Sequence, residues 1–230
     1  MGDARVEARA VTKDYPRAGA SGGALTAVRP LDLELGPGSL TVVTGRSGSG
    51  KSTLLSMLAG MLAPTSGTVL LDGANLYSLD ERSRSRLRNA KIGLVPQGHT
   101  ALRALSVLDN VLLPAVLYSR ERPPRQRAEH LLEAVGIAEL ARVGPHELSG
   151  GELRRMAVAR ALLMEPVVVL ADEPTAGLDE ESTAAVLELL RKTAQEGAAV
   201  LVVTHEEEAA RFADRVLTMA DGRLGDSPAR

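Results

Sequence analysis

A glycine-rich loop between an expected strand and an expected helix is the feature that most constrains this chain. The loop 45-GRSGSGKS-52 follows the apolar run 40-LTVVT-44 and precedes the helical run TLLSMLAG. In this context the pattern predicts a phosphate-binding loop, because glycines let backbone N–H groups close around phosphate oxygens at a helix N-terminus. A chance structural turn is the alternative, and the flanking strand and helix disfavour it.

Each residue of this loop is therefore a candidate contact for a nucleotide. Lys51 can neutralise the β- and γ-phosphates, and the hydroxyl of Ser52 can coordinate Mg²⁺. The expected nucleotide-binding residues of the loop are Gly45, Arg46, Ser47, Gly48, Ser49, Gly50, Lys51, Ser52 and Thr53.

Short Val- and Leu-rich runs alternate with helical patterns, which predicts an α/β fold with a largely parallel sheet. The expected strands are 6–11, 31–35, 40–44, 68–71, 92–95, 167–171, 199–203 and 215–219. The strand signal disappears after about residue 100, and 107–118 and 125–135 have helical patterns instead. We interpret residues of about 100–165 as a helical lobe inserted within a single domain of residues 1–230.

Three smaller features complete the expected organisation. The segment 17-RAGASGG-23 is typical of a surface turn between strands. Ser78 with Glu81 predicts a capping box that opens a helix, and the basic stretch 82-RSRSRLRNAK-91 follows. Its arginines spread around a helix axis, which favours a solvated helix over a contact with lipid headgroups.

The composition narrows the functional classes. A hydrophobic content of 44% and a charged content of 24% are ordinary for a globular protein. The net charge of −2 gives no reason to expect nucleic-acid binding, which usually requires a basic excess. The lack of cysteine and of a signal-peptide pattern suits a cytoplasmic location. No run of about 18 apolar residues occurs, so we expect any membrane role to come through a partner.

Two consecutive carboxylates end the apolar run 167-VVVLADE-173. In open α/β sheets the ligand binds at the carboxyl edge of the strands. We expect Asp172 to support Mg²⁺ and Glu173 to be the base that aligns the attacking water, since phosphoryl transfer demands mainly positioning and charge neutralisation. A solvated strand end is the alternative.

The segment 148-LSGGE-152 is the most specific signal in the chain. Ser149 and Glu152 form a capping box, which has a purely structural explanation. That explanation does not cover Gly150 and Gly151, which cost helix stability and are expected where backbone approaches a ligand closely. The glycine loop already binds the phosphates, so we expect this second clamp to come from another subunit.

Together with Gln97 and His205, these segments resemble the Walker A, Q-loop, signature, Walker B, D-loop and H-loop of ABC ATPases, over nearly the whole chain. The resemblance implies an α/β P-loop NTPase fold of the ABC type, with a mainly parallel sheet, an antiparallel β subdomain and an inserted helical lobe. It implies an ATPase that uses ATP and Mg²⁺. It also implies a head-to-tail dimer with a second copy or a related ATPase, docked under an integral membrane permease at the inner face of the membrane.

The same resemblance assigns roles to single residues. Gln97 senses the γ-phosphate and helps to hold Mg²⁺, and His205 contacts the γ-phosphate. Asp179, in 176-AGLD-179, lies at the dimer interface near the nucleotide, as do the signature residues Ser149, Gly150, Gly151 and Glu152. Tyr15 follows the first strand and stacks on adenine. A plain surface glutamine and a merely packed tyrosine are the alternatives.

Four segments are similar to the branch of this family that serves lipoprotein release and macrolide export by mechanotransmission: LSGGE, IGLVPQ, 109-DNVLLP-114 and 171-ADEPTAGLD-179. One departure is the signature helix, where Leu153 and Arg154 replace the usual glutamines of the branch. The alternative functions are a soluble ABC ATPase of cell division, repair or translation, and a nucleotide-gated regulatory protein. Glu173 and His205, both present, disfavour the regulatory alternative.

Overall fold

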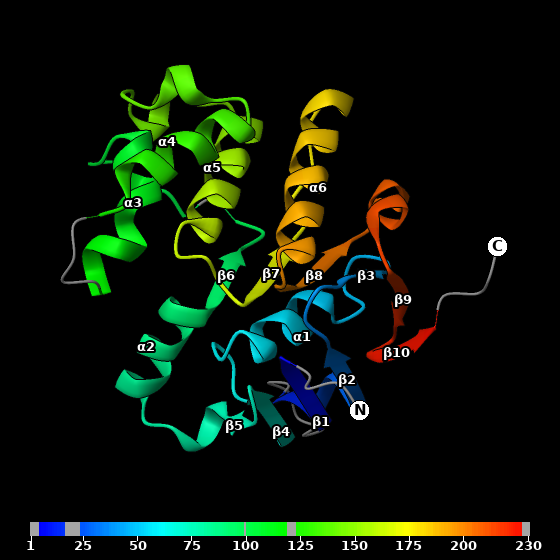
Figure 1. The fold of residues 1–230 in the computed structure, drawn as a ribbon. Coiled ribbons are helices and arrows are strands. Elements are labelled where there is room, and N and C mark those ends of the chain that lie inside the picture. The colour runs from blue at the N-terminus through cyan, green and yellow to red at the C-terminus, as the bar shows by residue number, and fades with distance from the viewer. Residues whose placement is uncertain (1–4, 17–23, 99, 119–122, 227–230) are drawn as a thin grey trace.

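The computed structural model describes residues 5–16, 24–98, 100–118 and 123–226, arranged as two sheets with helices around them (Figure 1). The predicted surface turn at 17–23 lies outside the described residues. None of the described helices is long and apolar enough to cross a membrane.

The larger sheet has six strands in the order β10-β9-β3-β8-β7-β6. Its strands are β3 (Leu40–Thr44), β6 (Ile92–Val95), β7 (Val168–Asp172), β8 (Ala199–Thr204), β9 (Arg215–Ala220) and β10 (Arg223–Asp226). All neighbours are parallel except β10, which pairs with β9 in the antiparallel sense. The carboxyl ends of β3, β6, β7 and β8 therefore lie at one edge of the sheet.

The smaller sheet is antiparallel, in the order β2-β1-β4-β5. Its strands are β1 (Val6–Pro16), β2 (Ala24–Leu35), β4 (Ser66–Leu71) and β5 (Ala74–Asn75). β1 and β2 extend beyond the predicted strands because their far ends pair with each other, Tyr15 opposite Leu25, while their side chains there are exposed. Main-chain pairing without burial leaves no hydrophobic alternation to detect.

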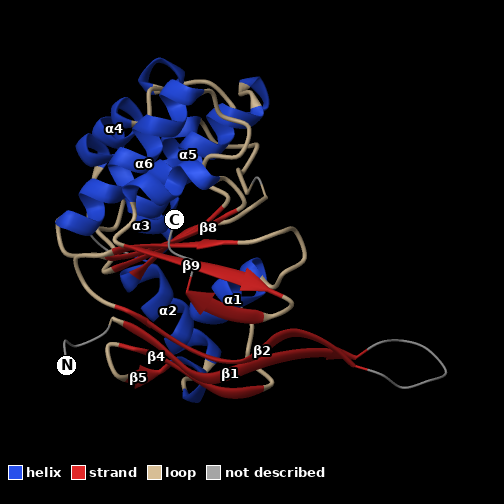
Figure 2. Cartoon of the chain, turned by 90° about the vertical axis from the view of Figure 1, so that its right-hand side faces the viewer, coloured by secondary structure: helices blue, strands red, loops and turns tan. Residues whose placement is uncertain are grey.

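Helices cover both faces of the larger sheet (Figure 2). They are α1 (Lys51–Leu58), α2 (Glu81–Lys91), α3 (Val107–Tyr118), α4 (Arg125–Ala134), α5 (Gly150–Leu162) and α6 (Glu180–Gln195), with short 3-10 turns at Leu76–Ser78, Ala138–Leu140, Pro145–Glu147 and Glu207–Phe212. Helices α3 to α6 lie beyond one face of the sheet, and α1 lies between the two sheets (Figure 2). Helices α3, α4 and α5 all fall between β6 and β7 in the chain.

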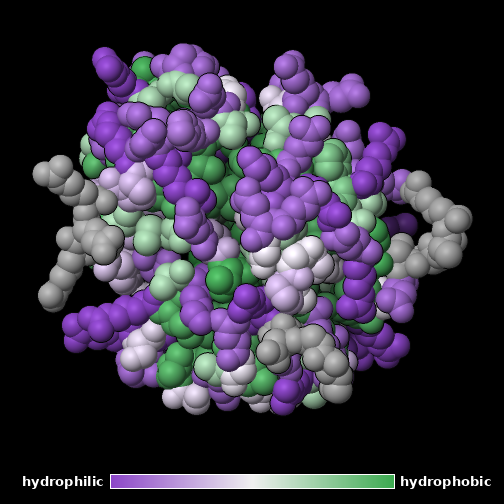
Figure 3. All heavy atoms as spheres, viewed as in Figure 1, coloured by the Kyte–Doolittle hydropathy of each residue, from purple (hydrophilic) through white to green (hydrophobic). Residues whose placement is uncertain are grey.

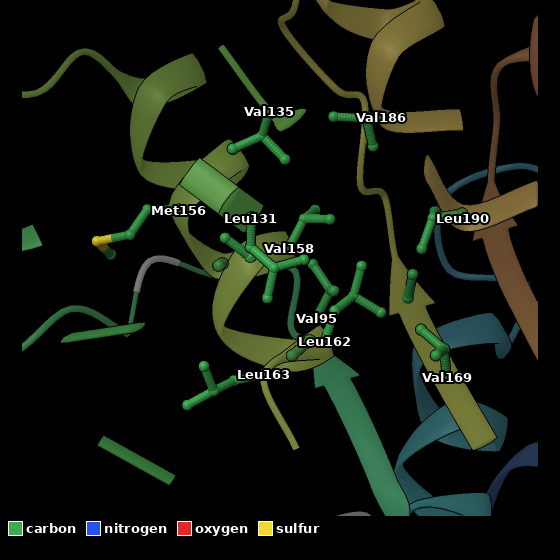
Figure 4. Packing of buried hydrophobic residues seen from close by; sticks show 14 of the residues in the cluster. Val95, Leu131, Val135, Met156, Val158, Leu162, Leu163, Val169, Val186 and Leu190 are labelled. Carbon is green, nitrogen blue, oxygen red and sulfur yellow. The ribbon is translucent and has the colours of Figure 1, made fainter. Parts of the chain in front are cut away.

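The side chains of the larger sheet alternate between two cores. Val42 and Val202 belong to the core shared with α3, α4, α5 and α6, whereas Val43 and Leu201 belong to the core shared with α1 and the antiparallel sheet. This alternation follows from the period of two in a strand. Figure 4 shows the first core, in which Val158 and Leu162 of α5 lie among side chains of α4, α6 and the strands β6 and β7.

The predicted capping box at Ser78 and Glu81 is wrong. Helix α2 begins at Glu81 with Asp80 as its N-cap, and the Asp80 carboxylate accepts a hydrogen bond from Ser83 N at 2.9 Å. The hydroxyl of Ser78 instead donates to the carbonyl of Asn75 at 2.9 Å, one turn earlier. None of the described residues of this helix is buried, as a solvated helix requires.

Candidate functional site

The carboxyl edge of the parallel sheet opens into a cavity of about 620 Å³. Four of the chain segments that reach it each follow one of the parallel strands: the glycine loop after β3, Gln97 after β6, Glu173 after β7 and His205 after β8. Ala27 of β2 and Arg154 of α5 reach it as well. The described residues that line it are Ala27, Arg46, Ser47, Gly48, Ser49, Gly50, Lys51, Ser52, Thr53, Gln97, Arg154, Glu173, Ala176 and His205. Residues far apart in the sequence thus meet where an α/β sheet binds ligands.

Two glycines of the loop have no room for a side chain. A Cβ at Gly45 would lie 2.3 Å from the carbonyl oxygen of Met219, and one at Gly50 would lie 2.4 Å from that of Ala27. Gly50 also has a φ of 108°, which L side chains rarely adopt. The loop therefore packs backbone against backbone, the arrangement in which backbone N–H groups can close around an anion.

Lys51 places a positive charge inside this loop. Its side chain is buried, and its Nζ donates to the carbonyl oxygens of Gly45 at 2.6 Å and Arg46 at 3.1 Å. Lys51 is also the first residue of α1, so the amino end of the helix and the ammonium group lie together. Both favour an anionic group at this point.

Glu173 is held from several sides at the end of β7. Its Oε2 accepts from the hydroxyl of Thr204 at 2.9 Å, and its Oε1 lies 2.9 Å from Nδ1 of His205. The Glu173 side chain is 10% exposed, whereas that of His205 is 61% exposed. The hydrogen bond to Glu173 raises the pKa of His205 above its ordinary value of 6.5. Glu173 thus has a defined orientation, and His205 reaches from it toward the open cavity.

Asp172 is buried beside the loop. Burial raises the pKa of Asp172, and a hydrogen bond from the hydroxyl of Ser52 opposes this rise. The Oδ1 of Asp172 has no hydrogen-bond partner among the described residues. A carboxylate and a hydroxyl in contact, with one carboxylate oxygen to spare, are ligands that suit Mg²⁺.

The signature segment lies in a second cavity of about 400 Å³. Its described lining consists of Ser149, Gly150, Gly151, Arg154, Arg155, Ala176, Gly177, Leu178, Asp179 and Ser182. The predicted capping box is present, since Ser149 N donates to the Glu152 carboxylate at 2.7 Å and Glu152 N donates to the Ser149 hydroxyl at 3.3 Å. Asp179 caps α6 by accepting from Ser182 N at 2.8 Å, and this bond lowers the pKa of Asp179.

Most of the predicted site residues divide into two groups within one chain, whereas Gly45, Asp172 and Glu152 are part of the described lining of neither cavity. Arg46 to Thr53, Gln97, Glu173 and His205 share the first cavity, while Ser149, Gly150, Gly151 and Asp179 share the second. Tyr15 is not part of the described lining of either cavity. It lies exposed in β1, with Nζ of Lys13 5.5 Å from the centroid of its ring.

Two residues at the site were not predicted from the sequence. Thr204 is fully buried and donates to Glu173, and Arg154 donates from α5 to the backbone carbonyl of Glu173. A signal for Thr204 was available, because a hydroxyl ends the apolar strand 199-AVLVVT-204 just before His205. Arg154 could have been noticed because it stands where the lipoprotein-release and macrolide-export branch usually has glutamine.

Comparison with known proteins identifies the family. A family model described as ABC transporter matches residues 28–176. The chain belongs to the ABC transporter family. The lipoprotein-releasing system ATP-binding protein LolD 1 of Rhodopirellula baltica is 42% identical over 216 residues, which are 93% of either chain. The LolD protein of Shewanella sp. strain MR-7 is also 42% identical, over 97% of this chain and 96% of the relative.

Solved structures agree with this assignment. The dimeric ABC transporter cassette MJ0796 has a TM-score of 0.90 and 32% identity, and the match covers 98% of this chain and 100% of that one. A post-hydrolysis state of the same cassette, bound to ADP and Pi, has a TM-score of 0.89. The predicted ABC family, fold class and ATPase activity are confirmed. The predicted resemblance to the lipoprotein-release branch is confirmed as well, since the LolD relatives carry that name.

Proposed function

We propose that this chain is the ATP-hydrolysing subunit of an ABC transporter of the lipoprotein-release type, and that it powers a separate membrane permease from the inner face of the membrane. The observation that carries the proposal is the meeting of Lys51, Gln97, Glu173 and His205 at one cavity. The LolD relatives, each 42% identical over more than nine-tenths of this chain, support the transporter type.

The side chains divide the work of hydrolysis among them. Lys51 and the amino end of α1 neutralise the β- and γ-phosphates, and Gln97 and His205 approach the γ-phosphate from the ends of β6 and β8. Glu173 orients the attacking water, because Thr204 and His205 fix its carboxylate. This division fits phosphoryl transfer, in which positioning and electrostatic stabilisation supply most of the catalysis.

The residues present fit a magnesium ion. Ser52, Asp172 and Gln97 would hold it, and the spare Oδ1 of Asp172 is the feature that favours this assignment. When bound, Mg²⁺ neutralises phosphate charge during transfer. Among the described residues no group of three or more His, Cys, Asp or Glu side chains could hold a metal. The phosphates of the nucleotide are therefore expected to complete the coordination.

The complete site is shared between two chains. Within one chain the glycine loop and the signature segment open into different cavities, although each has the features of a phosphate site. A head-to-tail dimer would bring the signature of one chain over the loop of the other. The dimeric cassette to which this chain is similar supports that arrangement.

The role of Glu173 is tested by Glu173→Gln. The amide keeps the size and the hydrogen-bond acceptor of the side chain but removes its charge, so ATP should still bind while turnover falls by orders of magnitude. The trapped ATP-bound dimer should then be visible by size-exclusion chromatography. Near-normal ATPase activity in this variant would reject the assignment.

The shared site is tested by mixing two inactive variants. Lys51→Ala removes the charge of the loop, and Ser149→Arg blocks the signature by bulk. In a mixed dimer one site carries both changes and the other carries neither, so activity should return if a single intact site can act. Crosslinking confirms that mixed dimers form. A monomer whose rate per chain is independent of protein concentration would refute the shared site.

The permease is proposed to dock beside α2 and α3. A groove of about 200 Å³ lies there, lined by Ala59, Met61, Ser85, Arg88, Asn89, Ile92, Leu94 and Tyr118. Met61 is 62% exposed and Tyr118 is 48% exposed, and Val116 and Leu117 beside Tyr118 are exposed as well. On the face shown in Figure 3, polar residues predominate, with hydrophobic residues showing between them. An exposed apolar cluster of this kind is typical of a protein interface.

Met61→Glu tests the docking surface. The charge should abolish co-purification with the permease and leave the ATPase activity of the isolated chain unchanged, because Met61 is outside both cavities. Retained co-purification would place the permease elsewhere on the surface.

A further inference from the structure

Arg154 of α5 reaches out of the signature helix into the nucleotide site. It lines both the cavity of the glycine loop and the cavity of the signature segment, so it forms part of the wall between them. Its Nη1 donates to the backbone carbonyl of Glu173. Arg155, the next residue, points elsewhere, since its Nη1 donates to the carbonyls of Val135 and Gly136, each at 3.0 Å.

The backbone of Glu173 needs external support. Its φ is +51°, a conformation that is uncommon for residues other than glycine and that persists only where the surroundings over-determine it. On one side Glu173 N donates to the carbonyl of Val203 in β8 at 2.8 Å. On the other side its carbonyl accepts from Arg154, and from Ala176 N at 3.3 Å. Of these contacts only that of Arg154 comes from α5.

We propose that Arg154 is a positioning residue that couples the placement of the signature helix to the orientation of the Glu173 carboxylate. When α5 lies in the position observed, the guanidinium holds the carbonyl of Glu173 and so stabilises the turn that aims its side chain into the cavity. A shift of α5 would release that turn. The inference rests on the proposed role of Glu173 in orienting water.

The charge at this position has a second consequence. Through its bond to the Glu173 carbonyl, Arg154 places a guanidinium charge at the end of β7, where the carboxylates Asp172 and Glu173 follow one another. A neutral glutamine at position 154, as in the branch, cannot act in this way and is also too short to reach as far. The departure from the branch therefore changes how the two carboxylates at the end of β7 are held.

The test compares three variants of the full chain at a concentration where it dimerises. Arg154→Gln should lower kcat for ATP hydrolysis about ten-fold, the loss expected for one charge-assisted hydrogen bond, with KM unchanged within about two-fold. Arg154→Lys keeps a charged donor and should recover most of that loss. In a Glu173→Gln background, Arg154→Gln should still form the ATP-bound dimer, because nucleotide binding does not depend on this contact.

Arg127→Gln is the matched control. Arg127 also donates to backbone carbonyls of the α5 region, those of Leu163 at 3.0 Å and Leu162 at 3.1 Å, but it lies outside both cavities. It should destabilise the fold to a similar degree, as measured by Tm, and leave kcat at the wild-type value. If Arg154→Gln does not fold, Arg154→Met carries the same expectation.

Three results would overturn the coupling. One is a kcat for Arg154→Gln within about two-fold of wild type. Another is a raised KM with an unchanged kcat, which would make Arg154 a direct phosphate ligand. The third is an equal loss of kcat in Arg127→Gln. Glu173→Gln is assayed beside them to separate the two hypotheses. An active Glu173→Gln would overturn the proposed role of Glu173 itself. An inactive Glu173→Gln together with a fully active Arg154→Gln would overturn only the coupling.

Discussion

Gly93 in β6 is expected to tolerate no side chain, although its φ is one that any residue adopts. A Cβ at this position would lie 2.4 Å from the carbonyl oxygen of Ala161 in α5 and 2.9 Å from Cγ of Pro166. Ordinary van der Waals contact begins near 3.4 Å. The carbonyl of Ala161 belongs to a helix and cannot rotate away by itself. Gly93→Ala must therefore push α5 and β6 apart.

The size of the effect follows from this crowding. Inserting a methyl group into a well-packed site costs about 1–3 kcal/mol in the free energy of unfolding. For a chain of this length each kcal/mol lowers Tm by about 2–4 °C, so Gly93→Ala should lower Tm by about 2–12 °C. Thermal unfolding followed by circular dichroism measures this shift. The control is Gly225→Ala in β10, where a Cβ meets nothing within 4 Å.

The same displacement should lower ATPase activity below the unfolding temperature. Helix α5 begins at the signature glycines, and β6 leads toward Gln97, so both of these segments, which we propose to contact phosphate, depend on this packing. The reasoning is refuted if the Tm of Gly93→Ala lies within about 1 °C of that of Gly225→Ala. In that event α5 would not be held as closely against β6 as the structure places it.

Three further substitutions test single contacts at the site. Thr204→Val removes the hydroxyl that donates to Glu173 and should lower kcat about ten-fold, whereas Thr204→Ser keeps the hydroxyl and should not. Equal kcat values in the two variants would contradict an orienting role for Thr204. Tyr15→Ala should raise the Kd for ATP several-fold and Tyr15→Phe should not, because stacking requires the ring alone; equal losses would point to the hydroxyl. Glu173 raises the pKa of His205, so the protonated histidine stabilises the folded chain. The difference in Tm between wild type and His205→Gln should therefore be largest below pH 6.5 and vanish as pH rises through the pKa of folded His205. A difference in Tm that does not change with pH would contradict this pairing.

The elements that could be predicted from the sequence are those bounded by changes in hydrophobicity. The predicted bounds of β3, β6 and α3 are those observed, because an apolar run in each ends at a loop. β10 (Arg223–Asp226) was not predicted, since its side chains are exposed or half-buried and it pairs back on β9 across a turn at Asp221 and Gly222. Of its side chains, Leu224 packs partly buried against the core, and a single apolar residue makes no alternating pattern that a sequence could reveal.

The candidate site divides in the same way. Lys51, Glu173 and His205 belong to local motifs, so the sequence alone predicts their chemistry. Their orientation depends on partners distant in the chain, because Thr204 and Arg154 contact Glu173 across separations of 31 and 19 residues. A motif specifies that a carboxylate follows a strand, but not what holds its backbone at a φ of +51°. Arg154 comes from the signature helix and is one of the two residues, with Leu153, at which this helix departs from the branch. Two cassettes with the same motifs can therefore differ in how firmly the carboxylate is aligned before the dimer closes.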